Sequence, residues 1–445
     1  MKQSNRAQRG NARVKLPERH QVEMQLMSLD QMVRGDAFVR TVVKYVDSLD
    51  LSELYCRIKA TSDHVGRAPI DPRILFSLWL FATLEGINSG RKIAKLTERD
   101  VAYMWICGGV SVNYHTVCDF RKDHGELVER ILTDSIAVLH HHDLVKLETL
   151  AQDGMRVRAS AGSGSFRRQG KLKECRKLAE QYLQQLKEES DSDDDEGKGV
   201  RSARLRAATE KLERIEQACL EMDGLQERYI KRNESMSKVH HRSEPRASTT
   251  DPEARRMKMG DNGFRPAMNV QFSNDVDALL IVGVDVTNVG SDAGLLAPMY
   301  HSVCTTYGTV PKKYLADGGF SKKEGVTELE KNGTQFYGKL HAEQKQLEAG
   351  KDPYQARPRE NGYFTEFRAR MGTQEAQDIY RQRAAAAEFP NAVCRNQGLR
   401  QFSVRGIAKA KAQVMWHALA YNFRRFGKLV DEKTGRTYRE ILMAI

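Results

Sequence analysis

Three carboxylates stand where an α/β protein could use them for chemistry. Asp153 lies in an apolar, strand-like segment, where a charge is costly unless it is paired or binds a metal ion. Asp317 follows the extended run 312–316 and precedes two glycines, which predicts the carboxyl end of a strand, the edge where α/β sheets bind ligands. Glu388 lies on a predicted helix that should end or kink beside it, because Pro390 cannot continue the backbone hydrogen bonding.

Converging carboxylates suit metal-assisted phosphoryl transfer. Such chemistry uses two metal ions, roughly 3.5–4 Å apart, that activate the attacking oxygen and stabilise the leaving one. Mg²⁺ prefers hard oxygen ligands and keeps positions for water and phosphate. Taken singly, each of the three carboxylates has an ordinary alternative, as a turn residue or an exposed helix residue. Asp285 is a distant fourth candidate, whereas Asp292 is interpreted as a helix N-cap.

Composition points to a polyanionic partner. The chain has 445 residues and a formal net charge of +12, which favours nucleic acid first and an anionic membrane surface second. No apolar stretch reaches the ~20 residues of a membrane helix. The seven cysteines form no CxxC pair, which fits a reducing cytoplasm and argues against a disulfide scaffold or a zinc site.

The first 145 residues predict a basic arm followed by helices. Residues 1–20 carry six lysines and arginines against one glutamate, and we expect a flexible basic arm there. Residues 21–145 have apolar groups at three- and four-residue steps, which predicts an all-α domain for DNA binding or dimerisation. Arg91 belongs to a small basic cluster in this part of the chain.

Beyond residue 146 the pattern changes to an α/β domain with an insertion. Extended runs are predicted around Asp153 and at 267–272, 278–286, 312–316 and 334–340, with a helix at 292–302. Residues 166–250 carry two heptad-spaced apolar seams joined by an acidic tip, which predicts a charged antiparallel helical hairpin. Its role stays open between a contact with DNA or a partner and a spacer arm.

The C-terminal stretch 389–430 contains no aspartate or glutamate. Its apolar residues predict a largely buried helix with a basic rim. The absence of acids favours phosphate contact, and Arg395, Lys409 and Lys411 are assigned to it.

The order of short motifs resembles the DDE transposases of bacterial insertion sequences, in the IS4/IS5 group and closest to the IS1182-like family. The resemblance covers most of the chain, and its order and spacing are more specific than any one motif. The segments that carry it are Gly66-Arg67, Pro72-Arg73, Ser89-Gly90-Arg91, Thr116 to Arg121, Asp153-Gly154, Ser248 to Pro252, Asn269 to Gln271, Ala316 to Phe320, the trio Tyr380, Arg383 and Glu388, and Ala418 to Asn422.

This resemblance implies a fold, a cofactor and a reaction. The core would be RNase H-like, a mixed sheet flanked by helices, formed by residues 146–165 and 251–445. Asp153, Asp317 and Glu388 would hold two Mg²⁺ or Mn²⁺ ions. The enzyme would cleave double-stranded DNA at the element ends and join the ends to target DNA, acting as a homodimer. The residues expected to contact DNA are Tyr380, Arg383, Arg395, Lys409, Lys411, Arg91 and Arg121.

Some positions depart from the pattern of the family. Arg383 and Glu388 are five residues apart instead of four, about 140° around an ideal helix, so Arg383 should point less directly at the metal site. Arg395 stands where lysine is usual, and the glycine that often follows Glu-X-Pro is missing. None of these changes removes a metal ligand.

Two other functions remain open at this point. One is an RNase H-like nuclease or resolvase that cuts without strand transfer, and the other is an inactive DNA-binding scaffold. In each case we expect a bacterial cytoplasmic protein associated with the nucleoid and no membrane.

Overall fold

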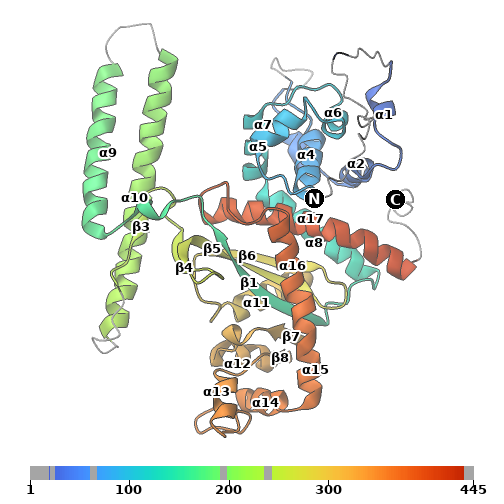
Figure 1. Cartoon of the computed structure of the whole chain (residues 1–445), viewed down its shortest axis with the longest axis vertical. Helices are drawn as coiled ribbons and strands as arrows, with labels where there is room; N and C mark the ends of the chain where they lie inside the picture. Colours follow the sequence, from blue (N-terminus) through green and yellow to red (C-terminus); the bar gives the residue numbers. More distant parts are fainter. Residues whose placement is uncertain (1–19, 21–25, 61–67, 191–197, 235–242, 435–445) are drawn as a thin grey trace, which may run out of the picture.

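The computed structural model describes residues 20, 26–60, 68–190, 198–234 and 243–434 (Figure 1). Most of the predicted basic arm, the Gly66-Arg67 motif and most of the acidic tip of the insertion lie outside these residues. Among the described helices, none is long and apolar enough to cross a membrane.

The N-terminal part is helical. Its elements are α1 (Leu29–Met32), α2 (Phe38–Ser48), α3 (Ser52–Cys56), α4 (Pro72–Leu84), α5 (Gly90–Leu96), α6 (Val101–Cys107), α7 (Tyr114–Asp123) and α8 (Gly125–His141). The apolar helix α4 forms the centre, since eleven of its thirteen residues are buried. It begins at the N-cap Asp71, whose carboxylate accepts from the backbone N–H of Arg73, with Pro72 in the first turn.

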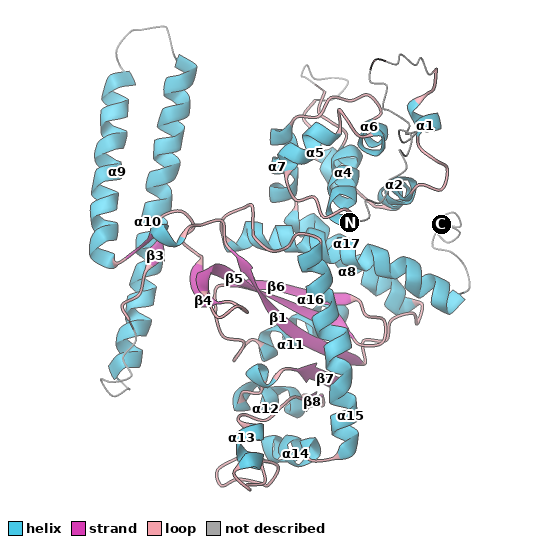
Figure 2. Cartoon of the chain, viewed as in Figure 1, coloured by secondary structure: helices cyan, strands magenta, loops and turns pink. Residues whose placement is uncertain are grey.

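A mixed six-stranded sheet follows (Figure 2). Its strands are β1 (Thr149–Arg158), β4 (Arg255–Lys258), β5 (Phe264–Asp275), β6 (Ile281–Thr287), β7 (Lys313–Ala316) and β8 (Gln335–Tyr337), in the order β4-β5-β1-β7-β8 with β6 also paired to β5. Strand β1 runs antiparallel to β5 and parallel to β7. The predicted extended runs all contain a strand, whereas β4 was not predicted.

Helices cover both faces of the sheet (Figure 2). One core contains α11 (Leu296–Tyr307), α12 (Lys323–Lys331) and α14 (Gly362–Met371), with the short α13 (Glu343–Glu348) beside them. On the other face, residues of β1, β5 and β6 share a continuous apolar core with α2, α4, α7, α8 and α17 (Ile407–Thr434). The sheet and the N-terminal helices are therefore joined by one core.

The insertion is a pair of long helices beside the sheet (Figure 1). After the 3-10 turn η1 (Ser163–Ser165), the two-residue strands β2 (Phe166–Arg167) and β3 (Ala247–Ser248) pair at its base. Helices α9 (Gln169–Ser190) and α10 (Lys198–Glu234) pack along each other, as predicted. On α9 the side chain of Leu183 is buried, whereas that of its neighbour Tyr182 is half exposed.

Helix α17 is the buried C-terminal helix that the sequence predicts. Trp416 is 1% exposed and packs against Phe76 and Phe120, with ring centroids 4.7 and 6.4 Å away. Its basic residues are largely occupied by the fold, because Arg424 donates to the carbonyl of Leu84 and Arg425 to that of Ala278. This part of the basic rim does not favour phosphate contact.

His417, also on α17, predicts how stability depends on pH. It is 1% exposed, and neither ring nitrogen has a hydrogen-bond partner within the described part of the chain. Burial, with a smaller contribution from Arg121, lowers the pKa of His417 to about 3. The unfolded chain then binds the proton more readily, so the folded state loses stability as pH falls below ~6.5, by about 2 kcal/mol at pH 5.

We expect His417→Leu to remove this loss. Denaturant unfolding at pH 7.5 and pH 5 should show a smaller acid destabilisation in the variant than in the wild type. Equal differences between the two pH values in both proteins would contradict the assignment.

Candidate active site

Asp153 and Asp317 lie just beyond the point where the ladder between two parallel strands ends. The register of β1 and β7 aligns Gln152 with Ala316, the last pair of the ladder, and each aspartate is the next residue along its chain. Asp317 follows the end of β7, whereas Asp153 lies in the middle of β1, and neighbouring strands are roughly 4.8 Å apart, so the two aspartates occupy adjacent positions. Asp317 begins the 3-10 turn η3 (Gly318–Phe320), and its carboxylate accepts from the N–H of Gly318 at 2.6 Å.

The surroundings of Asp153 disfavour its negative charge. Burial raises the pKa of Asp153 to about 6, although the Gly154 backbone, Arg383 and Asn391 act in the opposite direction, and Glu388 adds to the rise. A nearby cation stabilises the charged form of a carboxylate whose pKa is raised by burial. A raised pKa is therefore expected of a buried carboxylate that binds a metal ion.

Glu388 lies over β1 on a helix that changes its pitch. Helix α15 (Gln374–Arg383) passes into a π-helical turn, η4 (Ala384–Glu388), and then into α16 (Phe389–Asn396). The turn η4 packs against β1 and β5. Of the two outcomes predicted beside Pro390, an end or a kink, the end does not occur, because the backbone stays helical through Glu388 and Phe389; the irregularity there is the π-helical turn.

The π-helical turn explains why the helix continues. Pro390 provides no N–H for a carbonyl four residues earlier, and the wider turn before it accommodates that loss. The same turn corrects the expected direction of Arg383. Because a π turn holds more residues than an α turn, positions five apart face the same way, and Arg383 Nη2 donates to Glu388 Oε1 at 2.6 Å.

Tyr380 completes this cluster. The guanidinium of Arg383 lies 5.7 Å from the centre of the Tyr380 ring. Burial raises the pKa of Tyr380, with opposing effects from Arg383 and Asp317. The helical trio Tyr380, Arg383 and Glu388 therefore lies within electrostatic reach of the two strand-borne aspartates.

A buried polar ladder stands directly beside Asp153. Asp292 Oδ1 accepts from Asn269 at 2.8 Å and from Gln271 at 3.0 Å, and its Oδ2 accepts from Arg156 at 2.8 Å. Asp292 is therefore not the N-cap of α11, which is Leu295. Its charge is already satisfied, which argues against a role as a metal ligand. The ladder could not be predicted from the sequence, because its members come from β1, from β5 and from the loop after β6, which are far apart in the chain.

Asp285 does not join the site. The residue is exposed on β6, although burial of its carboxyl group is the main cause of its raised pKa, and the side-chain charges that act on it are those of Lys411 and Glu129. The suggested fourth ligand is therefore not supported.

Asn391 is a site residue that the sequence analysis missed. Its Nδ2 donates to Asp153 Oδ2 at 2.8 Å, and it follows Glu388 by three residues, so both can face β1. Asn391 is 6% exposed, and its Oδ1 has no partner within the described part of the chain. An amide in this position fixes the orientation of one carboxylate and leaves an oxygen free beside it.

We expect Asn391→Leu to weaken metal binding and turnover by roughly 10- to 100-fold, the usual loss when a residue that supports a ligand is removed. Titration of the enzyme with Mn²⁺ measures the affinity, and excess Mn²⁺ should recover part of the activity. Asn396→Leu, an exposed change on the same helix, is the control. Unchanged metal affinity in Asn391→Leu would remove Asn391 from the site.

The donor set fits a hard divalent cation, but the three side chains do not yet form a cage. No group of three histidine, cysteine or acidic residues within the described ranges is close enough to hold a metal ion as it stands. The carboxylate of Glu388 is 56% exposed and is paired with Arg383.

A basic groove includes the residue that follows Asp153 in the chain. A cavity of about 680 Å³ is lined by Gly154, next to Asp153, and by Arg395 from α16. We call it the basic groove; its cationic residues are Arg156, Arg158, Lys258, Arg265, Arg395 and Arg400, against Asp261, which pairs with Arg265. Arg395, predicted to contact phosphate, is thus exposed at the edge of the candidate site.

The other basic residues predicted to contact DNA divide into two groups. Arg91 and Lys409 are exposed and line one cleft of about 1050 Å³ between α5, α10 and the loop before α17. Lys411 forms an ion pair with Glu129 at 2.8 Å.

The side chain of Arg121 is 4% exposed. Its guanidinium lies over the Trp79 ring and donates to the carbonyl of Asn88 and to the hydroxyl of Ser403. Arg121 also borders the cleft of Arg91 and Lys409, but its guanidinium is used within the fold, which does not favour the predicted contact with DNA.

Two family models match the chain. One, described as a transposase domain (DUF772), covers residues 27–123, and the other, a transposase DDE domain, covers residues 344–427. Together the two matches support a DDE transposase of the IS1182-like type. The second match contains Arg383, Glu388 and Asn391. Comparison with curated proteins and with solved structures gave no match.

Membership explains the architecture at a coarse level. A DDE domain implies an RNase H-like fold, and the mixed sheet with flanking helices is consistent with it. This transposase is therefore a DNA-binding enzyme of a mobile element, in a family that generally uses divalent metal ions.

Proposed function

We propose that this transposase cleaves DNA at the ends of an insertion sequence and joins those ends to target DNA. The adjacent positions of Asp153 and Asp317, with the helix of Glu388 packed on β1, carry the proposal. In the first step water attacks the phosphodiester at the element end, and the 3′-oxygen leaves. In the second step the freed 3′-hydroxyl attacks a target phosphodiester and displaces another 3′-oxygen, so the number of bonds is conserved.

The residues would divide the work as follows. Asp153, Asp317 and Glu388 would hold two Mg²⁺ or Mn²⁺ ions, which supply a Lewis acid for the attacking and leaving oxygens. Asn391 orients Asp153 through its 2.8 Å hydrogen bond. Arg383 donates a hydrogen bond to Glu388, and it would bind a phosphate when Glu388 binds a cation instead. Tyr380, whose ring lies beside Arg383, would pack against the DNA.

DNA would enter along the basic groove. Arg395 and Arg400 come from α16 and the segment after it, and Arg156 and Arg158 come from β1, so two elements that also carry site residues supply the cations of the groove. Contacts of this kind position the backbone without reading sequence. Two element ends require two sites, which supports a homodimer on DNA in the bacterial nucleoid.

The domain boundaries follow from this proposal. Residues 21–145 would form the all-α domain, 166–250 the insertion, and 146–165 with 251–445 the catalytic core. The shared apolar core of α4 and α17 supports a rigid connection between the first and the last of these.

A strand-transfer assay tests the function. The full chain is incubated with a labelled duplex that ends in the inverted repeat taken from the DNA flanking the gene, together with a supercoiled plasmid and Mg²⁺, Mn²⁺ or EDTA. We expect cleavage and joined products with either metal and neither with EDTA. Cleavage without joining would favour a nuclease or resolvase, and binding without cleavage in both metals would favour a scaffold.

A further inference from the structure

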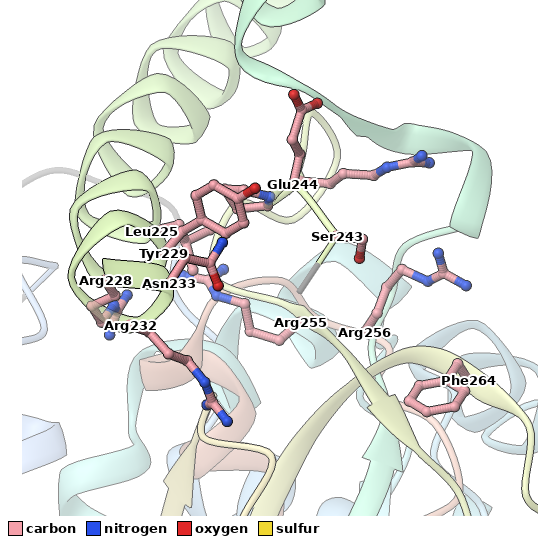
Figure 3. Close-up of a pocket in the computed structure, with 12 residues that line it drawn as sticks. Leu225, Arg228, Tyr229, Arg232, Asn233, Ser243, Glu244, Arg255, Arg256 and Phe264 are labelled. Atoms are coloured by element: carbon pink, nitrogen blue, oxygen red, sulfur yellow. The ribbon is translucent and has the colours of Figure 1, made fainter. Parts of the chain in front are cut away.

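A second basic cavity lies away from the carboxylates, where the insertion meets the sheet. We call it the insertion pocket. It has a volume of about 700 Å³ and lies between the second half of α10, the segment 243–246 and the β4–β5 hairpin. Figure 3 shows Arg228, Tyr229 and Arg232 on the helix and Arg255 and Arg256 on the facing strand.

The charge of this pocket is strongly positive. Arg228, Arg246 and Arg256 line it and are exposed, and none of the three has an ion pair with another described residue. The one acid among its lining residues, Glu244, is paired with Arg168 at 3.1 Å. Arginines held together without counter-charges repel one another, so the arrangement favours an anion that brings several charges.

The shape of the pocket favours DNA over a membrane. A membrane-binding surface presents a flat face with apolar side chains that can enter the lipid. Here the cations line a concave space between a helix and a strand. Arginine side chains on the walls of such a space can form paired hydrogen bonds with the backbone phosphates of a DNA duplex.

Strand β4 lines both the insertion pocket and the basic groove. Arg256 lines the pocket, and Lys258, two residues later on the same short strand, lines the groove beside Gly154. Phe264, which pairs with Lys258 across the hairpin, is 58% exposed and also borders the pocket. One hairpin thus separates two basic cavities that open along the same edge of the sheet.

We propose that the insertion pocket binds the backbone of the DNA duplex that also occupies the basic groove. The helical hairpin is then a clamp on the substrate, and α10 carries its contact surface in its second half. This inference rests on the proposed function for the identity of the duplex, but DNA binding and catalysis are measured separately.

Arginine neutralisation tests the clamp. Binding of a fluorescent 40-base-pair duplex to the full chain is measured at several salt concentrations, for the wild type and for Arg228→Gln/Arg256→Gln. Each lost phosphate contact should lower the slope of log affinity against log salt by about 0.9, so we expect a decrease of roughly 2 and binding roughly 10- to 100-fold weaker at 0.1 M salt.

The same helix provides a matched control. Arg204→Gln/Arg206→Gln removes the same charge from exposed positions roughly 33 Å along α10 from Arg228, and it should leave affinity and slope nearly unchanged. If both double variants lose affinity equally, the effect is one of net charge and the clamp is refuted. If Arg228→Gln/Arg256→Gln binds like the wild type, or loses binding to anionic vesicles but not to DNA, the clamp is likewise refuted.

These outcomes are distinguishable from failure of the proposed function. A wild type that never cuts DNA would refute the strand-transfer proposal in the cleavage assay. The comparison of the two double variants would still report whether α10 contacts the duplex.

Discussion

Asp153→Asn is expected to reduce DNA cleavage and joining by at least about 10³-fold, equivalent to roughly 4 kcal/mol of transition-state stabilisation. The amide has nearly the same shape as the carboxylate, and its oxygen can still accept from Asn391 Nδ2, so the fold should be kept. It lacks the negative charge that a divalent cation requires. Asp317→Asn and Glu388→Gln should have effects of similar size for the same reason.

The strand-transfer assay measures the loss, and binding of duplex DNA shows whether the variants are intact. Asp285→Asn is the control, since this exposed carboxylate on β6 lies away from the site. Near wild-type turnover of Asp153→Asn would refute the metal site. Loss of turnover in Asp285→Asn as well would show that Asp285 also belongs to the active site.

Gly154→Ala is expected to lower both stability and turnover, although it adds a single methyl group. An added Cβ would lie 2.2 Å from Gln271 Nε2 and 2.7 Å from Asp292 Oδ1. These atoms cannot easily move, because Gln271 is hydrogen-bonded to both Asn269 and Asp292. We expect about 1–3 kcal/mol of destabilisation from this overpacking. A displacement of Asp153 next to it should reduce turnover by roughly 10- to 100-fold.

Denaturant unfolding and the strand-transfer assay measure these two effects. Gly162→Ala serves as the control, because no atom lies within 4 Å of the position where its Cβ would be. If Gly154→Ala unfolds at the wild-type denaturant concentration and keeps full turnover, the polar ladder does not support the site.

The strand-borne half of the site was accessible from the sequence. Asp153 interrupts an apolar run, and Asp317 stands between a strand and a glycine pair, so local pattern alone indicated both strand contexts. The parallel pairing of β1 with β7, which makes them neighbours, depends on contacts across 160 residues of chain and is not encoded in either segment. The insertion helices and the buried α17 were likewise visible as apolar periodicity.

The helix-borne half was less accessible. A spacing rule for an ideal α-helix placed Arg383 away from Glu388, and a single π-helical turn reversed that prediction. Asn391 carries no charge and lies in no strong motif, so only its contact with Asp153 reveals it. Arg121 was misjudged in the opposite direction, since a basic residue in a polar helix gives no sign that its guanidinium will be buried on Trp79.

The core shared by α4 and α17 has a consequence for biosynthesis. Phe76 and Trp79 are made early, whereas the Trp416 ring that packs against them belongs to a helix near the end of this sequence. Domains commonly fold in order as they leave the ribosome. Here the apolar faces of the N-terminal helices, such as α4, stay exposed to solvent until α17 has been synthesised. Chains released before α17 is made should therefore be targets for chaperones and proteases.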